Sequence, residues 1–345
     1  MQKGELMTKF KSVLPRINSD EEYEQLNLND ELFKNAAREI VTQHNLADAP
    51  LSLLGGTNIV FSYGNKRIIK IFPPIHHSQF TSEALVMKHL SNQLTVATPT
   101  VEFEGVISGW PYIIMNRLDG VPLEGLWEGL DHPNKIIIMR ELGSLIREVH
   151  SLPTQGLEAI DCHWEDFIAN QMTQCVAKHK STNLPEVLLA QIPEYIKSMA
   201  GYLPTIKKPV ILTGEYTPMN FIVKQKSGVW HIEGLIDFGD AMLGLPEYDL
   251  LGPGAFLIQG DKELLKEFLL AYGYAQEDLT DKLSHQLTLL MLLHKYSNLN
   301  AQIRIDNWKE KVSNINDLEQ LVWGTQNNNA KAQELNCELQ PRSQP

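Results

Sequence analysis

The chain has 345 residues, 43% of them hydrophobic, and a net charge of −12. This length supports a sizeable core and predicts two domains or lobes. No block of Lys and Arg occurs, so the electrostatic footprint of a nucleic-acid binder is missing and we expect no nucleic-acid partner. The three cysteines are odd in number and match no zinc or redox spacing, which indicates a reduced, intracellular chain.

Neither end of the chain nor its most apolar run suggests a membrane. The N-terminus lacks the apolar segment of a signal peptide. The run Leu287–Leu293 is far too short to span a bilayer and is typical of a buried helix. We therefore expect a cytoplasmic protein with no membrane partner, present as a monomer or a weak homodimer.

The first third of the chain reads as a helical segment followed by a small β-rich lobe. Apolar residues at helical spacing precede Pro50, and short β-like runs separated by Gly and Asn turns follow it. The predicted elements are, in order, a helical segment within 1–47, strands at 51–54, 59–63 and 66–72, a helix at about 78–92, and strands near 101–104 and 112–115. We place this lobe at 48–118, with a hinge near 116–120.

The rest of the chain, 119–325, is predicted to be a larger and mostly helical lobe. Helices are expected around 139–149, 164–179 and 184–199 and again from 247 to 323. One β-rich island, 210–237, interrupts them with two strands and a turn at 226–228. The tail 326–345 is rich in Asn, Gln and Ser and is predicted to be disordered. The fold class is therefore α+β with two lobes.

The β-rich island carries the strongest chemical signal. A hairpin with strands at 221–224 and 230–236 brings Asn220 and Asp237 to the same end. Mg²⁺ bound to a nucleotide takes one or two protein oxygen ligands and completes its shell with phosphates and water. Glu215, one loop away, is placed to orient an acceptor hydroxyl. An Asp cap before a turn would explain the sequence at 236–239 alone, but the longer pattern is more specific.

The small lobe supplies independent support. Gly55 and Gly56, followed by Thr57 and Asn58, lie between two strands, where glycines let backbone amides approach phosphate oxygens. Lys70 lies in the middle of an apolar strand, and Glu83 follows on the next helix at a distance suited to pairing. The order of glycine loop, strand lysine, helix glutamate, hinge and metal loop agrees with the kinase template.

These segments resemble the aminoglycoside phosphotransferase family, which shares the protein-kinase-like fold with choline kinases. The similarity covers about residues 50–320. It is carried by LLGGTNIVF, IIKIF, YIIMNRLDGVPL, ELGSLIREVHSLP and GLIDFGDAMLGLPEYDL. The segment from Trp164 to Ile196 resembles the helical insert of the hygromycin-kinase-like branch, which helps to wall the acceptor pocket.

The resemblance implies a role for each matching residue. Lys70 contacts the α- and β-phosphates and is held by Glu83, while Asn220 and Asp237 ligate magnesium. It implies an ATP cofactor, with GTP left open, and a structural role for Asp249. The remaining nucleotide contacts that it implies are Gly55, Gly56 and Asn58 over the phosphates, and Met115, Asn116 and Leu118 against adenine.

The catalytic loop departs from the family pattern. The family reads His-Gly-Asp, then four residues and Asn, whereas this chain has Thr213, Gly214 and Glu215 before Asn220. Phosphoryl transfer relies mostly on positioning and charge neutralisation, so a glutamate can still align the hydroxyl. We expect an O-phosphotransferase acting on a small hydroxylated acceptor, such as an aminoglycoside or aminocyclitol.

Other functions stay open at this point. The changed loop also suits a nucleotide-binding pseudokinase, and the fold also suits a kinase of choline or another amino alcohol. A protein kinase is disfavoured, because the short stretch between Phe238 and Glu247 holds no long activation segment to cradle a peptide.

Overall fold

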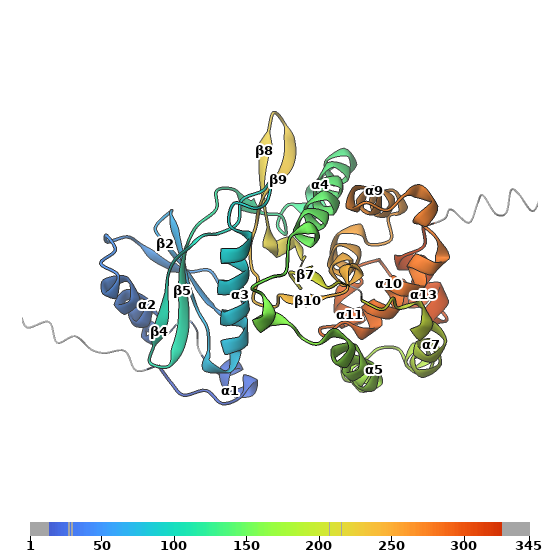
Figure 1. The fold of residues 1–345 in the computed structure, drawn as a ribbon, viewed down its shortest axis with the longest axis horizontal. Helices are drawn as coiled ribbons and strands as arrows, with labels where there is room; N and C mark the ends of the chain where they lie inside the picture. The colour runs from blue at the N-terminus through green and yellow to red at the C-terminus, as the bar shows by residue number, and fades with distance from the viewer. Residues whose placement is uncertain (1–13, 27, 29, 207, 215, 326–345) are drawn as a thin grey trace, which may run out of the picture. The chain divides into compact units, whose positions relative to one another are not determined.

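The computed structural model describes residues 14–26, 28, 30–206, 208–214 and 216–325. Predictions on the first 13 residues, on Glu215 and on the tail 326–345 lie outside these residues. The chain forms two compact units. Unit 1 takes in the chain up to residue 93, then 97–119 and 238–240; unit 2 takes in 94–96, 120–237 and the chain from 241 onward (Figure 1).

Unit 1 is built on a five-stranded antiparallel sheet. Its strands are β1 (Leu51–Leu53), β2 (Ile59–Tyr63), β3 (Arg67–Ile71), β4 (Val101–Ile107) and β5 (Trp110–Asn116), in the order β1-β2-β3-β5-β4. The strands predicted near 101–104 and 112–115 are longer than expected and meet in a tight hairpin. The hairpin turns at Ser108 and Gly109, both with positive φ, a conformation that glycine adopts at no steric cost.

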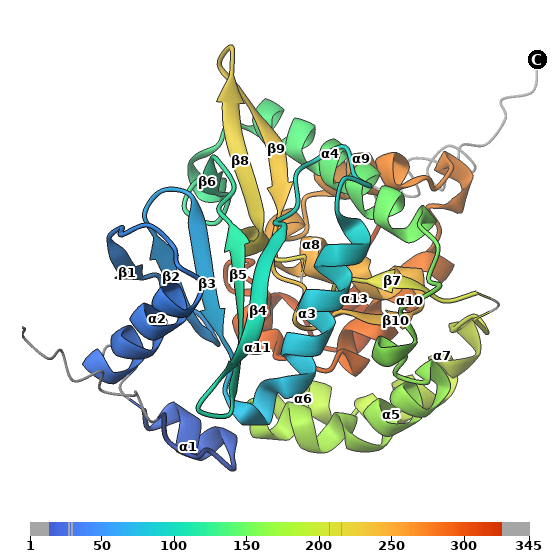
Figure 2. The ribbon, with the colours of Figure 1, turned by 60° about the vertical axis from the view of Figure 1, so that its left-hand side comes forward.

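Helices cover both faces of this sheet (Figure 2). The helical segment predicted before Pro50 contains α1 (Asp20–Glu24) and α2 (Glu31–Gln43). The apolar stripe of α2, including Phe33 and Ile40, packs in one core with Ile69, Ile71 and Trp110. On the other face lies α3 (His77–Leu90). Because side chains alternate along a strand, Lys70 points away from the α2 core, to the side of α3.

Unit 2 is mostly helical, as predicted. Its longer helices are α4 (His132–Ser151), α5 (Trp164–Ser181), α7 (Ile192–Met199), α9 (Lys262–Tyr272), α10 (Asp281–Leu293) and α13 (Ile315–Val322), with short α6 (Glu186–Leu189), α8 (Leu251–Pro253), α11 (Leu299–Gln302) and α12 (Trp308–Lys311). The single helix predicted over 184–199 is wrong: α6 and α7 are separate. Pro193 in the first turn of α7 explains the break, because proline cannot donate the hydrogen bond that a continuous helix needs.

Two small sheets carry the loops of unit 2. β7 (Val210–Leu212) pairs with β10 (Met242–Gly244), and β8 (Phe221–Lys226) pairs with β6 (Val121–Pro122) and β9 (Val229–Leu235). The predicted hairpin of the β-rich island is therefore confirmed as β8 and β9. The α+β class, with strands concentrated in the first unit and helices in the second, is confirmed as well.

Three side chains of α5 hold the C-terminal end of α10. Cys175 Sγ and His179 Nε2 both donate to the Leu292 carbonyl, at 3.4 and 3.0 Å, and Lys178 Nζ donates to the His294 carbonyl at 3.0 Å. Burial lowers the pKa of His179, which keeps its ring neutral with a proton on Nε2. The last carbonyls of a helix lack intrahelical partners, so these donors fix where α10 ends.

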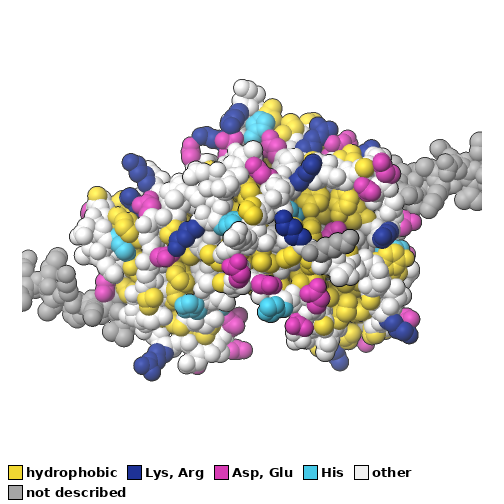
Figure 3. Space-filling model, in the orientation of Figure 1, with side chains coloured by type: hydrophobic (Ala, Val, Ile, Leu, Met, Phe, Trp, Pro, Cys, Tyr) yellow, Lys and Arg dark blue, Asp and Glu magenta, His cyan; other side chains and the backbone are white. Residues whose placement is uncertain are grey.

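The surface carries charges of both signs. On the face seen in Figure 3, Lys and Arg side chains lie scattered among Asp and Glu rather than gathered in one patch. Within the described part of the chain, no helix is both long enough and apolar enough to cross a bilayer.

Candidate active site

The two predicted metal ligands lie close together at the open end of the β8–β9 hairpin, opposite its turn. The Ile236 amide donates to the Asn220 carbonyl at 3.0 Å, so Asn220 lies beside the residue that precedes Asp237. Asn220 is buried, and Asp237 is partly exposed. Asp237 has a φ of +67°, in the left-handed region that Asp and Asn adopt more readily than most residues.

The oxygen donors at this end suit Mg²⁺. One amide oxygen and one carboxylate match an ion that takes few protein ligands and keeps phosphate and water in its shell. Among the described residues, no cluster of three or more His, Cys, Asp and Glu is arranged to hold a metal alone. One amide and one carboxylate would leave most positions around such an ion to phosphate and water.

In unit 1 the predicted ion pair of Lys70 and Glu83 is present. Lys70 Nζ lies 2.6 Å from Glu83 Oε2, and both side chains are buried. The ammonium also lies 5.3 Å from the centre of the Phe72 ring. A buried pair of this kind holds the lysine on the α3 side of the sheet, where its charge can meet an anion.

The glycine loop between β1 and β2 has positive φ angles at both glycines, a conformation that other residues rarely adopt. Gly55 and Gly56 have φ of +83° and +127°, and no atom lies within 4 Å of the position that a Gly55 Cβ would take. A side chain at 55 is therefore excluded by backbone conformation rather than by crowding.

The structure places Asn58 differently from its neighbours in that loop. Its side chain is buried, donates to Gln79 Oε1 at 3.1 Å and lies 3.3 Å from His76 Nδ1. Tyr23 Oη donates to the carbonyl of Thr57 at 2.9 Å. These contacts pin the loop to the helices of unit 1, so the Asn58 side chain anchors the loop.

The hinge segment follows β5. Met115 is buried opposite Ile68, and the Asn116 amide donates to the Thr100 carbonyl at 3.3 Å. The Asn116 Oδ1 accepts from the Thr100 amide at 2.5 Å, and the Arg117 amide donates to the Lys66 carbonyl at 2.7 Å. The amides of residues 116 and 117 are therefore already used within unit 1.

The loop at 213–214 is held by a buried carboxylate. Asp249 Oδ2 accepts from the Thr213 amide at 2.9 Å, and Oδ1 accepts from the Gly214 amide at 3.1 Å. His150 Nε2 lies 3.2 Å from Asp249 Oδ2, and its Nδ1 lies 3.0 Å from Tyr272 Oη. The structural role implied for Asp249 is thus visible, whereas no pattern pointed to His150 beyond its place in EVHSLP.

Three hydroxyl groups of this loop are buried without a hydrogen-bond partner among the described residues: Thr213 Oγ1, Tyr216 Oη and Thr217 Oγ1. Burial, with Asp249 as a nearby negative charge, raises the pKa of Tyr216 well above its ordinary value. Gly252 seats the loop, because a Cβ there would lie 2.6 Å from the Tyr216 carbonyl oxygen.

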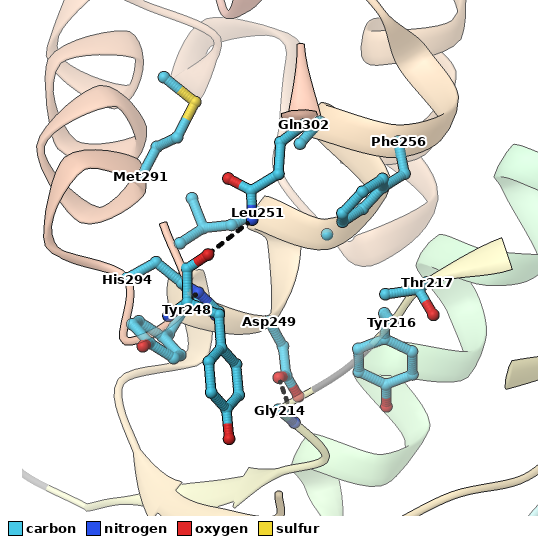
Figure 4. Close-up of a pocket in the computed structure, with 13 residues that line it drawn as sticks. Gly214, Tyr216, Thr217, Tyr248, Asp249, Leu251, Phe256, Met291, His294 and Gln302 are labelled. Atoms are coloured by element: carbon cyan, nitrogen blue, oxygen red, sulfur yellow. Dashed lines mark hydrogen bonds between the residues drawn. The ribbon is translucent and has the colours of Figure 1, made fainter. Parts of the chain in front are cut away.

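A pocket of about 100 Å³ opens beside this loop in unit 2 (Figure 4). Its lining comes from three stretches far apart in the sequence. They contribute Gly214, Tyr216 and Thr217; Tyr248, Asp249, Leu251, Gly252, Ala255 and Phe256; and Met291, His294, Tyr296 and Gln302. Sequence reasoning missed most of these residues, because no local motif links the stretch at 291–302 to the catalytic loop.

Comparison with known proteins places the chain in a class. Residues 55–284 match the family described as the phosphotransferase enzyme family, which is more than half of the chain. The chain belongs to this family. The resemblance found in the sequence is confirmed, and the protein is a small-molecule phosphotransferase.

Solved structures support the same fold. The chain is similar to the GDP complex of wild-type aminoglycoside 2'-phosphotransferase-IIIa (TM-score 0.63, 19% identity, covering 86% of this chain and 98% of that one). It is also similar to aminoglycoside phosphotransferase APH(3'')-Id from Streptomyces rimosus (0.52, 20%, 75% and 97%). A third is the macrolide 2'-phosphotransferase MphH from Brachybacterium faecium (0.53, 17%, 75% and 90%). At these identities the likeness shows the fold alone.

Proposed function

We propose that the protein transfers the γ-phosphate of a nucleoside triphosphate, bound with Mg²⁺, to a hydroxyl group of a small acceptor. The observation that carries this proposal is the buried Lys70–Glu83 pair, at 2.6 Å, on the side of the sheet away from the α2 core. A buried lysine held by a carboxylate is suited to neutralise phosphate charge. The family match over both units supports the same reaction.

Each group of residues has one task in this proposal. Lys70 binds the phosphates and Glu83 fixes its position, while the backbone at Gly55 and Gly56 closes over them. The Leu118 amide donates to the base. Asn220 and Asp237 hold Mg²⁺, which would neutralise charge on the transferring phosphate when bound.

Glu215 completes the assignment as the group that orients the acceptor hydroxyl, and it lies outside the described residues. Its support is the loop around it: Asp249 fixes the backbone of Thr213 and Gly214 regardless of their side chains. The loop can therefore keep its course although Thr213 replaces the family histidine.

The test uses Asp237→Asn, because asparagine tolerates the left-handed backbone at this position while losing the charge. Titration calorimetry with ATP, and separately with GTP, in the presence of Mg²⁺ should show strong binding to the wild type and a loss of at least about tenfold in the variant. Asp240→Asn, three residues further on, serves as the control. Unchanged nucleotide affinity in Asp237→Asn would contradict the proposal.

A nucleotide-binding pseudokinase is the second candidate, favoured by the change at Thr213 and Glu215. Nucleotide turnover by Glu215→Ala and Glu215→Asp separates the two. An enzyme that uses Glu215 should lose turnover in the alanine variant and keep part of it in the aspartate variant. Equal turnover in wild type and Glu215→Ala would exclude Glu215 as the orienting group.

A further inference from the structure

The glycine loop between β1 and β2 depends on contacts from outside the loop to keep one conformation. Residues 54–57 are exposed, and Gly55 and Gly56 both have positive φ. Glycine loses more conformational freedom than any other residue when its backbone is fixed, so an unanchored loop of this kind would have to be ordered by its ligand. Contacts that order the loop beforehand lower that cost and strengthen binding.

The buried hydroxyl of Tyr23 supplies one such contact. Tyr23 Oη donates to the Thr57 carbonyl at 2.9 Å, and the residue is only 7% exposed. Burial raises the pKa of Tyr23 to about 12, so at neutral pH the hydroxyl keeps the proton that it donates. The hydrogen bond therefore fixes the backbone of the loop one residue after Gly56.

The ring of Tyr23 is itself packed within unit 1. It lies edge-on to His76, with ring centroids 5.6 Å apart, and its centroid lies 6.3 Å from that of Trp110. Trp110 Nε1 donates to the Pro15 carbonyl at 2.9 Å, which ties the segment before α1 to the β4–β5 hairpin. Tyr23 thus reaches the Thr57 carbonyl from a packed position rather than from a freely moving side chain.

A second set of contacts holds the loop at the next residue. Asn58 Nδ2 donates to Gln79 Oε1 at 3.1 Å, and Asn58 Oδ1 lies 3.3 Å from His76 Nδ1. His76 Nε2 lies 2.8 Å from Asp20 Oδ1, on the same helix as Tyr23. Helix α1 therefore holds the loop in two ways, directly through Tyr23 and indirectly through His76 and Asn58.

We propose that Tyr23 is a positioning residue for nucleotide binding: its hydroxyl fixes the glycine loop in the conformation that closes over the phosphates. The claim that the loop contacts phosphates rests on the proposed function. Tyr23 acts only through Thr57 and does not itself touch the nucleotide. It lies outside residues 55–284, which carry the family match, so the anchor comes from a part of the chain that the match does not include.

The test compares two buried tyrosines of the same core. Tyr63, at the other end of β2, is 5% exposed, and its Oη donates to the Ala47 carbonyl at 2.6 Å, so Tyr63→Phe loses the same kind of bond away from the loop. In titration calorimetry with Mg²⁺, Tyr23→Phe should bind ATP about fivefold more weakly than the wild type. Its affinity for adenosine, measured by competition with ATP, should be unchanged, because adenosine has no phosphates. Tyr63→Phe should change neither affinity.

A second pair of variants tests the indirect contact. His76→Ala removes the ring beside both Tyr23 and Asn58, and it should also weaken ATP binding without changing the affinity for adenosine. His77→Ala, at the exposed histidine next in the chain, is the matched control and should bind both like the wild type. ATP affinity in Tyr23→Phe equal to that of Tyr63→Phe would overturn the proposal, and so would an equal loss of ATP and adenosine affinity. GTP and guanosine replace these probes if the wild type prefers GTP.

Hydrogen exchange of the nucleotide-free protein separates this inference from the proposed function. The Leu54 amide donates to the Val60 carbonyl at 2.8 Å at the base of the loop, so its exchange reports on the order of the loop without a ligand. Exchange should be faster in Tyr23→Phe than in Tyr63→Phe. Equal exchange in the two variants, with nucleotide binding intact, would overturn the inference alone. If the wild type binds neither ATP nor GTP, the proposed function fails, and the difference in exchange still decides whether Tyr23 orders the loop.

Discussion

The two units hold their functional groups by different means. In unit 1, Lys70 is held by the Glu83 carboxylate, so its position depends on the identity of both residues. In unit 2, the loop at Thr213 and Gly214 is held through its backbone amides, which any residue but proline supplies. The Lys70–Glu83 pair matches the pattern of the family, whereas the side chains of Thr213 and Glu215 depart from it. A backbone anchor tolerates side-chain change in a way that an ion pair does not.

Breaking the ion pair should give the largest effect on stability. Glu83→Ala leaves the Lys70 ammonium buried beside an empty site, which costs about 3–5 kcal/mol in the free energy of unfolding. The double variant Lys70→Met, Glu83→Leu should recover most of that loss, because an apolar pair avoids the desolvation penalty. Urea unfolding measures both values.

Nucleotide affinity then separates a role of the Lys70–Glu83 pair in stability from a role in phosphate binding. The double variant should be stable and still fail to bind ATP, since the phosphate charge has lost its partner. If that variant binds ATP normally, the pair serves the fold alone and the assignment of Lys70 is wrong.

Removing the backbone anchor should give the next largest effect. Asp249→Ala leaves the amides of Thr213 and Gly214 without their acceptor, at a cost of about 3 kcal/mol. Turnover should fall by about 10²-fold or more, because displacement of the loop by roughly 1 Å misplaces the acceptor. Asp249→Asn keeps one acceptor oxygen and should lie between alanine and wild type in both measurements.

If the two units are anchored independently, Asp249→Ala should lower turnover and leave nucleotide binding unchanged. Calorimetry with ATP should therefore give a dissociation constant close to that of the wild type in any folded Asp249 variant. Asp306→Ala, at an exposed carboxylate, is the control. Loss of ATP binding in the folded Asp249→Asn variant would show that the two units are not anchored independently.

Tyr216→Phe should give the smallest effect, with an opposite sign. It removes a buried hydroxyl that lacks a partner among the described residues, so the variant should gain up to about 1 kcal/mol at neutral pH. The raised pKa of Tyr216 sets a pH dependence. Above pH 10 the unfolded chain ionises this residue and the folded chain does not, so the wild type loses stability that the variant keeps.

Urea midpoints of both proteins near pH 8 and above pH 10 test this sign. The gap between variant and wild type should widen as the pH rises. A gap that narrows would mean that the Tyr216 hydroxyl is stabilised in the folded protein by a contact that the described residues do not include.

The sequence was informative where function depends on local pattern. Strand alternation and helical spacing located Lys70 and Glu83, and two apolar runs around one turn located the hairpin that joins Asn220 to Asp237. Local pattern was silent on the pocket of unit 2, because Tyr248 meets His294 only through tertiary packing. It also could not show that the Asn58 side chain turns to Gln79 and His76.

The hydrogen bonds from α5 to the end of α10 link substitutions on α5 to the shape of the pocket in unit 2. Cys175, Lys178 and His179 hold the carbonyls of Leu292 and His294, within the stretch that forms the pocket wall. A mutation on α5 can therefore change the shape of this pocket without altering Lys70, Glu83, Asn220 or Asp237. Libraries that screen for an altered choice of ligand should therefore begin with substitutions on α5.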